Sequence, residues 1–230
     1  FIQKIAQADF NIRVSKLTPV ERKMLLMLYY DLFENAGRYT TLQEMTDELS
    51  TDKHFCNELK EVINILLQNT HAYEKEDNST LSNFPLKVHG VYTKAQIQAA
   101  IGTSTLERKS PAREGAERNK DLKLEAMFVD IIKDREEGST TNYDDKALSP
   151  HLFQWDTQNS VSPDTNVGKA YINQTQTMLL FVREQKNFAD DKTRTMGYVY
   201  LGRVTLNKWE YKNLGTRWQM QILWNMIEPI

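Results

Sequence analysis

The sequence Met178-Leu179-Leu180-Phe181-Val182-Arg183 is a compact apolar run that ends in a positive charge. Its length and its polar flanks are typical of a strand in the centre of a sheet. Residues 198–206 and 218–226 alternate apolar and polar side chains, which predicts two half-buried strands. With an apolar, β-branched segment at 126–133, these segments predict a mostly antiparallel β-sheet or a partly open barrel over residues 85–230.

Residues 1–80 carry the signals of a helical module instead. Thr18-Pro19-Val20-Glu21 and Thr41-Leu42-Gln43-Glu44 each combine an N-cap threonine with the reciprocal glutamate of a capping box. A further apolar periodicity over residues 52–68 predicts a third helix. We therefore expect an α+β protein, with its domain boundary in the polar, turn-rich residues 77–85.

Charge decides how the helical module is interpreted. Its three predicted helices, followed by residues 73–77, can be drawn as a winged helix-turn-helix. Residues 44–77, however, contain nine acidic and three basic side chains, and DNA phosphates would repel such a surface. We therefore favour a support or protein-docking role for residues 1–80 over a DNA-reading role.

Composition restricts the class of protein and its compartment. Hydrophobic residues make up 40% of the chain and charged residues 26%, which is typical of a globular protein. No apolar run approaches the roughly 20 residues that span a bilayer, so we expect no membrane partner. The single cysteine, Cys56, cannot form an internal disulfide, which predicts a cytoplasmic protein. The chain begins at Phe1 without a signal-like segment, and we expect it to be a piece of a longer polypeptide.

Aromatic and polar residues alternate between residues 143 and 183. We predict that this segment and nearby cations form a nucleic-acid surface. We expect bases to stack on Tyr143, Trp155 and Tyr171. We expect phosphates to be contacted by Arg113, Lys133 and Arg183. The edge of a flipped base would be read by Asp144 and Gln158. The alternative interpretation places Trp155 in the core of the β domain, where it would only pack.

A nuclease motif is the competing chemical interpretation. Asp164 follows a proline, and Glu184 and Lys186 come directly after the apolar strand. In PD-(D/E)xK nucleases two carboxylates hold Mg²⁺, while the lysine helps to polarise water. The turn-like surroundings of Asp164 and the scarcity of helix after residue 103 argue against this motif. The four histidines also lack metal-ligand spacing, so we expect no catalytic residue and no metal ligand in this chain.

Several short motifs carry a resemblance when they are read in order. They are Leu86-Lys87-Val88-His89, Tyr92-Thr93, Ala100-Ile101-Gly102, Arg113-Glu114-Gly115, the Phe128-Val129 strand ending in Lys133, Tyr143-Asp144-Asp145, Ser149 with Leu152-Phe153, Trp155 and Gln158, Tyr171-Ile172, and Leu180-Phe181-Val182-Arg183-Glu184. Over residues 85–230 the series resembles the uncharacterised C-terminal domain of bacterial superfamily-two helicases. These are DEAD/DEAH-box proteins of the restriction type, which often carry a phospholipase-D-like nuclease domain.

The resemblance implies a parent enzyme that uses ATP and Mg²⁺ to remodel DNA, in restriction-modification or phage defence. The sequence contains no Walker A motif, so we expect neither ATPase activity nor a cofactor in this chain itself. The resemblance implies an accessory, non-catalytic DNA-binding or substrate-recognition domain, with DNA and the helicase core of the same polypeptide as partners. Two alternatives remain open: a Mg²⁺-dependent nuclease, and a protein-interaction module that docks on the helicase core.

Overall fold

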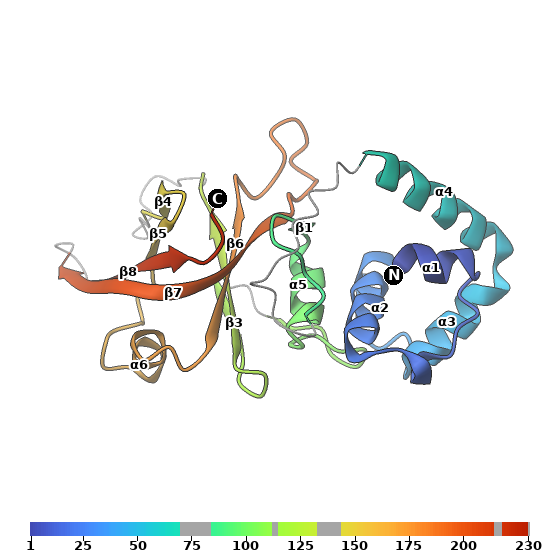
Figure 1. Ribbon diagram of the computed structural model, residues 1–230, viewed down its shortest axis with the longest axis horizontal. Coiled ribbons are helices and arrows are strands. Elements are labelled where there is room, and N and C mark those ends of the chain that lie inside the picture. The colour runs from blue at the N-terminus through green and yellow to red at the C-terminus, as the bar shows by residue number, and fades with distance from the viewer. Residues whose placement is uncertain (70–83, 112–114, 133–143, 214–217, 230) are drawn as a thin grey trace. The chain divides into compact units, whose positions relative to one another are not determined.

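The computed structural model describes residues 1–69, 84–111, 115–132, 144–213 and 218–229 (Figure 1). The chain divides into two compact units, which are Phe1–Pro85 with Ala95–Pro111, and Leu86–Lys94 with Ala112–Ile230. We call them the helical unit and the sheet unit. In the described part of the chain, no helix is both long and apolar enough to cross a membrane.

The helical unit forms where the sequence places its capping signals. Its elements are α1 (Ile2–Gln7), the 3-10 helix η1 (Val14–Lys16), α2 (Pro19–Leu32), α3 (Leu42–Thr51), α4 (Lys53–Asn69) and most of α5 (Lys94–Ala100). Both predicted capping boxes are confirmed at the starts of α2 and α3. The hydroxyls of Thr18 and Thr41 accept the backbone N–H groups of Glu21 and Glu44 at 3.2 and 3.1 Å. Each box satisfies two backbone donors that a helix start leaves without an intrahelical acceptor.

Residues 95–111 belong to the helical unit, although the sequence places them within the range 85–230. The hydroxyl of Tyr30 donates to the carbonyl oxygen of Thr105 at 2.6 Å. The side-chain amide of Gln96 donates to Asp31 at 2.8 Å. These contacts join residues more than sixty positions apart, a separation that local sequence patterns do not report.

Eight strands of the described chain form one open sheet. They are β1 (Val91–Tyr92), β2 (Ala116–Asn119), β3 (Leu124–Asp130), β4 (Lys146–Ser149), β5 (Leu152–Asp156), β6 (Thr177–Arg183), β7 (Tyr198–Asn213) and β8 (Trp218–Met226). The strand order is β2-β3-β6-β7-β8-β5-β4, and β1 pairs with the beginning of β7. The pair β3–β6 is parallel and the other pairs are antiparallel. The predicted α+β class with a mostly antiparallel sheet is confirmed.

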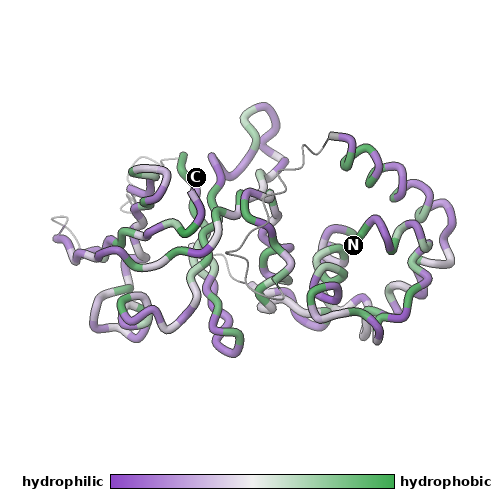
Figure 2. The backbone as a smooth tube through the Cα atoms, in the orientation of Figure 1, coloured by the Kyte–Doolittle hydropathy of each residue, from purple (hydrophilic) through white to green (hydrophobic). Residues whose placement is uncertain are grey.

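The apolar run at residues 178–183 lies in β6, in the middle of this order. β6 has a strand on each edge, β3 and β7, and residues 178–181 are buried. A strand that is covered on both faces needs no polar alternation, which explains its continuous apolar sequence. Figure 2 shows this contrast, since hydrophobic residues concentrate along β3 and β6 whereas the outer end of β7 is mostly hydrophilic.

A bulge gives β7 its course across the sheet. Opposite β6, Leu180 pairs with Gly202 and Phe181 pairs with Tyr200, which leaves Leu201 as the extra residue. Gly202 has a φ of 91°, a conformation that favours glycine. A bulge bends its strand and increases the local twist. After Val204 the pairing of β7 with β6 ends, and β7 continues in pairing with β8 as far as Asn213.

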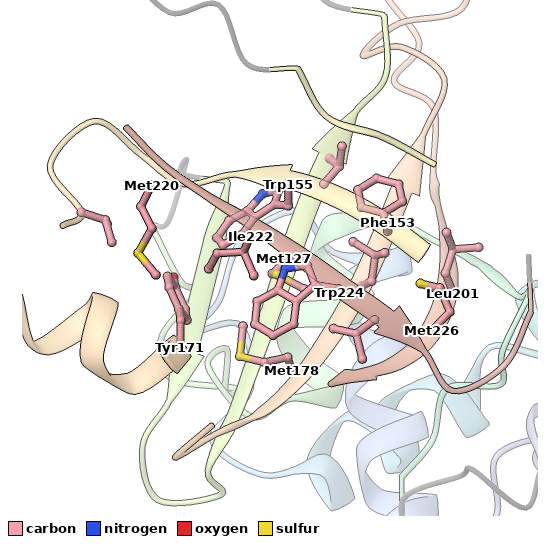
Figure 3. Close-up of a cluster of buried hydrophobic side chains, with 14 residues drawn as sticks. Met127, Phe153, Trp155, Tyr171, Met178, Leu201, Met220, Ile222, Trp224 and Met226 are labelled. Carbon is pink, nitrogen blue, oxygen red and sulfur yellow. The ribbon is translucent and has the colours of Figure 1, made fainter. Parts of the chain in front are cut away.

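The main core of the sheet unit lies on one face of these strands (Figure 3). Trp224 is fully buried at its centre, with Trp155 of β5 and Tyr171 beside it. Tyr171 comes from the short helix α6 (Asn166–Ile172), which begins at the N-cap Thr165. The aromatic rings meet at tilted or edge-on angles, the arrangement that ring quadrupoles prefer. α6 therefore supplies one wall of the core and was not predicted from the sequence.

Candidate nucleic-acid interface

The outer end of the β7–β8 pair is a surface that we call the ribbon and define as residues 208–213 and 218–223. On its other edge β8 also pairs with β5, as far out as Gln221. Here Lys208 pairs with Leu223, Tyr211 with Met220, and Asn213 with Trp218. Residues 207–213 of β7 are all exposed, because β6 has ended and β8 remains their described strand neighbour. Figure 1 shows the two strands running side by side away from β3 and β6.

One face of the ribbon is aromatic. Side chains alternate along a strand, and register partners share a face, so Trp209, Tyr211 and Trp218 lie on the same side. Their exposed fractions are 37, 38 and 51%. The rings of Tyr211 and Trp218 stack across the strands, with centroids 5.1 Å apart and an interplanar angle of 27°. Three large rings therefore remain open to solvent on one surface.

The opposite face of the ribbon carries its charges. Glu210 accepts from Lys208 at 3.1 Å and from Lys212 at 3.0 Å. Hydrogen bonds from Lys212 and then Lys208 lower the pKa of the Glu210 carboxyl. Lys212 also donates to the side-chain oxygen of Gln221 at 2.7 Å. Gln221 in turn donates to the Asp156 carboxylate at 2.9 Å, so two lysines and two carboxylates share this face.

Two of the rings predicted to stack on bases lie in the core instead. Trp155 is 4% exposed and Tyr171 is 2% exposed, and their centroids are 5.4 Å apart. The hydroxyl of Tyr171 donates to buried Glu125 at 2.7 Å. Burial, and then the Glu125 charge, raise the pKa of this phenol. The stacking role does not fit either position, because a base needs an open ring face.

Arg183, expected to contact phosphate, uses all three side-chain nitrogens within the sheet unit. Nε and Nη2 donate to the two carboxylate oxygens of Asp130 at 2.7 and 3.0 Å. Nη1 donates to the carbonyl oxygen of Met196 at 3.2 Å, and the guanidinium lies 4.2 Å from the ring centroid of Tyr198. This bidentate pair joins the ends of β3 and β6, which run parallel at that point. The phosphate role does not fit a guanidinium so fully engaged.

The remaining predicted residues divide into two groups. Asp144 precedes β4 in the chain, and Gln158 follows β5. The backbone N–H of Asp144 donates to the carboxylate of Asp156, the last residue of β5, at 2.8 Å. Gln154 donates to the Asp144 carbonyl and carboxylate oxygens, so Asp144 takes part in a local network that Lys146 extends. The other three residues, Arg113, Lys133 and Tyr143, lie outside the described residues.

A family model matches residues 86–230, and its description is "Domain of unknown function (DUF3427)". The matched range covers the described strands and α6 of the sheet unit. The chain belongs to the DUF3427 family. This agrees with the resemblance to an uncharacterised domain.

Comparisons of whole proteins add little to the family match. A search of curated proteins found no match. Among solved structures, the chain resembles KRYPTONITE in complex with mCHG DNA and SAH, with a TM-score of 0.46, 10% identity, and coverage of 91% of this chain and 43% of that one. It also resembles Arabidopsis thaliana SUVH6 in complex with SAM, with a TM-score of 0.41, 12% identity, and coverage of 92% and 40%. The chain spans about two fifths of these structures, and at such TM-scores the likeness supports no functional inference.

The DUF3427 sheet does not bring the residues of the nuclease alternative together. Asp164 is exposed in the turn before α6, whereas Glu184 and Lys186 are exposed after the end of β6. α6 contacts Glu125, whose strand partner Met178 lies near the beginning of β6. Six residues of strand, about 20 Å, separate Met178 from Glu184. Among the described residues, no group of three His, Cys, Asp or Glu side chains is arranged to hold a metal ion.

Sequence reasoning missed the DUF3427 ribbon because it ended the seventh strand at Leu206. The signal was present in Lys208-Trp209-Glu210-Tyr211-Lys212, where charged and aromatic residues alternate strictly. Such a segment predicts a strand with one aromatic and one charged face. Both of its faces are exposed, although its partners Met220 and Ile222 in β8 are buried in the core.

Proposed function

We propose that this DUF3427 domain is an accessory, non-catalytic DNA-binding module, and that the ribbon is its contact surface. One observation carries the proposal. Trp209, Tyr211 and Trp218 are large rings exposed on one face of the ribbon, at the edge of the core that buries Met220 and Ile222. Exposed aromatic clusters of this kind are costly to leave in water and are found at binding surfaces.

The chemistry of the ribbon favours nucleic acid as the occupant. Base stacking on aromatic side chains contributes about 1–3 kcal/mol per base and tolerates any sequence. Lys208 and Lys212 are exposed within the same ribbon and can contact phosphates. A protein partner of ordinary composition would need complementary apolar side chains, whereas every nucleotide offers both a flat ring and a negative charge.

The helicase context is part of the same proposal. The motifs of residues 85–230 resemble a domain attached to superfamily-two helicases, so the parent enzyme would bind ATP and Mg²⁺ and act on DNA. In that setting the ribbon would hold substrate while the helicase core of the same polypeptide moves it. The helical unit, with its acidic surface, would serve as support or as a docking surface for that core.

Fluorescence anisotropy with labelled DNA tests the proposal directly. We expect the chain to bind oligonucleotides, and the double variant Trp209→Ala/Trp218→Ala to lose most of that affinity while remaining folded. Leu148→Ala is the matched control, because it removes another exposed apolar side chain, 46% exposed, from β4 of the same unit. A second variant, Lys212→Ala, removes a cation of the ribbon. Its matched control is Lys146→Ala, since both lysines are exposed and paired with a carboxylate. The proposal fails if DNA does not bind, or if the Trp variant and Leu148→Ala bind it equally well.

A further inference from the structure

We infer that the ribbon recognises unpaired bases, either in a single strand or at the open end of a duplex, and not the closed double helix. The inference rests on the proposed function and names the substrate class of the same surface. Its basis is the pair formed by Tyr211 and Trp218, which we call the stacking pair.

The stacking pair is held by the register of the ribbon. Tyr211 is opposite Met220, and Trp218 is opposite Asn213, so the two rings are diagonal neighbours on one face. Long aromatic side chains reach across that diagonal. Their planes are within 27° of parallel, and each residue keeps more than a third of its surface exposed. The two rings are therefore stacked on each other near the outer end of two strands, and each can offer only its outer face to a base.

A flat ring platform matches the face of a base and not its edge. In closed duplex DNA each base is covered on both faces by its neighbours, and proteins read hydrogen-bonding groups in the grooves. The exposed described side chains on the aromatic face are the three rings and Asn213, none of which carries a charge, whereas Met220 and Ile222 beside them are buried. This face offers π surface, which an unpaired base can cover and a groove cannot.

The placement of charge supports the same substrate class. Lys208 and Lys212 project from the opposite face and share Glu210, so the ribbon does not line its aromatic face with cations. Duplex binders that follow the backbone neutralise many phosphates, and their affinity falls steeply with salt. For the ribbon we expect one or two phosphate contacts, which gives a slope of log affinity against log salt of about −1 for a single strand.

The experiment compares three labelled DNA probes of one sequence. They are a single strand of about 15 nucleotides, a duplex with a single-stranded overhang, and a dumbbell duplex whose ends are closed by non-nucleotide linkers, so that it contains no unpaired base. We expect the first two to bind at least tenfold more tightly than the dumbbell. Tyr211→Ala and Trp218→Ala should each weaken single-strand binding by about 5- to 150-fold, the range that corresponds to one lost stacking contact. Tyr211→Phe, which keeps the ring, should bind nearly as well as wild type.

The outcomes separate this inference from the proposed function. Equal affinity for the dumbbell and the single strand would overturn the inference and leave DNA binding by the ribbon intact. Unchanged single-strand affinity in both Ala variants would also overturn it. Absence of binding to all three probes would overturn the inference together with the proposed function, and would favour a protein that docks on the ribbon.

Discussion

The phenolic oxygen of Tyr171 lies 2.7 Å from Oε1 of Glu125, a residue 46 positions earlier in the chain. Glu125 is 3% exposed, and Arg118 from the neighbouring strand donates to its other carboxylate oxygen. The bond therefore ties α6 to β3 and satisfies part of a charge that would be costly to bury alone.

Replacing Tyr171 with Phe removes this donor without removing the ring. We expect Tyr171→Phe to lower the free energy of unfolding by about 1–3 kcal/mol, because Glu125 loses a buried hydrogen bond. Urea unfolding monitored by tryptophan fluorescence measures the change. Tyr211→Phe is the matched control, since the Tyr211 side chain is exposed, and it should leave the midpoint nearly unchanged. Equal midpoints for all three proteins would show that the bond contributes nothing to stability.

Trp155 and Trp218 provide a second matched pair, because the same residue type occupies a buried and an exposed position. Trp155→Ala should destabilise the sheet unit by about 3–5 kcal/mol through loss of buried contacts and a cavity. Trp218→Ala should change stability by about 0.5 kcal/mol or less. Thermal and urea unfolding of both variants measure these values. If Trp155→Ala unfolds at the wild-type midpoint, the ring is not part of the core.

Arg183 is expected to affect stability rather than DNA binding. Arg183→Ala leaves the Asp130 carboxylate without its two guanidinium bonds and should cost about 1–3 kcal/mol. A double-mutant cycle with Asp130→Ala isolates the pair, and the two changes should be clearly less than additive. Arg183→Lys should not restore the loss, because an ammonium cannot form the bidentate geometry. A reduced salt dependence of DNA affinity in folded Arg183→Ala, but not in Arg183→Lys, would instead assign a phosphate contact to this residue.

Asp9 in the helical unit should control part of the acid sensitivity. Hydrogen bonds from Lys60 and then Lys53 lower its pKa below the ordinary value of 3.8. The pKa of Asp9 is lower in the folded than in the unfolded state. At pH values above the unfolded-state pKa, the charged carboxylate therefore stabilises the fold. This stabilisation is lost as the pH falls through the folded-state pKa. Asp9→Asn suits the test, because Asn tolerates the positive φ of 49° at this position.

Unfolding free energies at a series of pH values measure the effect. The difference between wild type and Asp9→Asn should be constant above about pH 5 and should shrink toward zero below about pH 3. Lys53→Ala, which removes the longer of the two contacts, should show the same trend with a smaller amplitude. A difference that does not change with pH would mean that the carboxylate charge plays no part.

Local features of this chain were readable from its sequence. The boxes at Thr18 and Thr41 start α2 and α3, and the strand predicted at residues 218–226 has the bounds of β8. Capping and side-chain periodicity act over a few residues, so the sequence contains the whole cause. The α+β class follows from the order of such segments.

Tertiary structure decided which of these residues are available to a ligand. Trp155 and Trp218 both lie in strands with alternating sequence patterns. The ring of Trp155 is buried against Tyr171 of α6 and Trp224 of β8, whereas the side chain of Trp218 stays half exposed. The parallel pairing of β3 with β6 sets the Arg183–Asp130 bond, and the end of β6 leaves the outer part of β7 exposed. Burial depends on partners far away in the chain, so a strand pattern predicts two faces but does not say which face stays open to solvent.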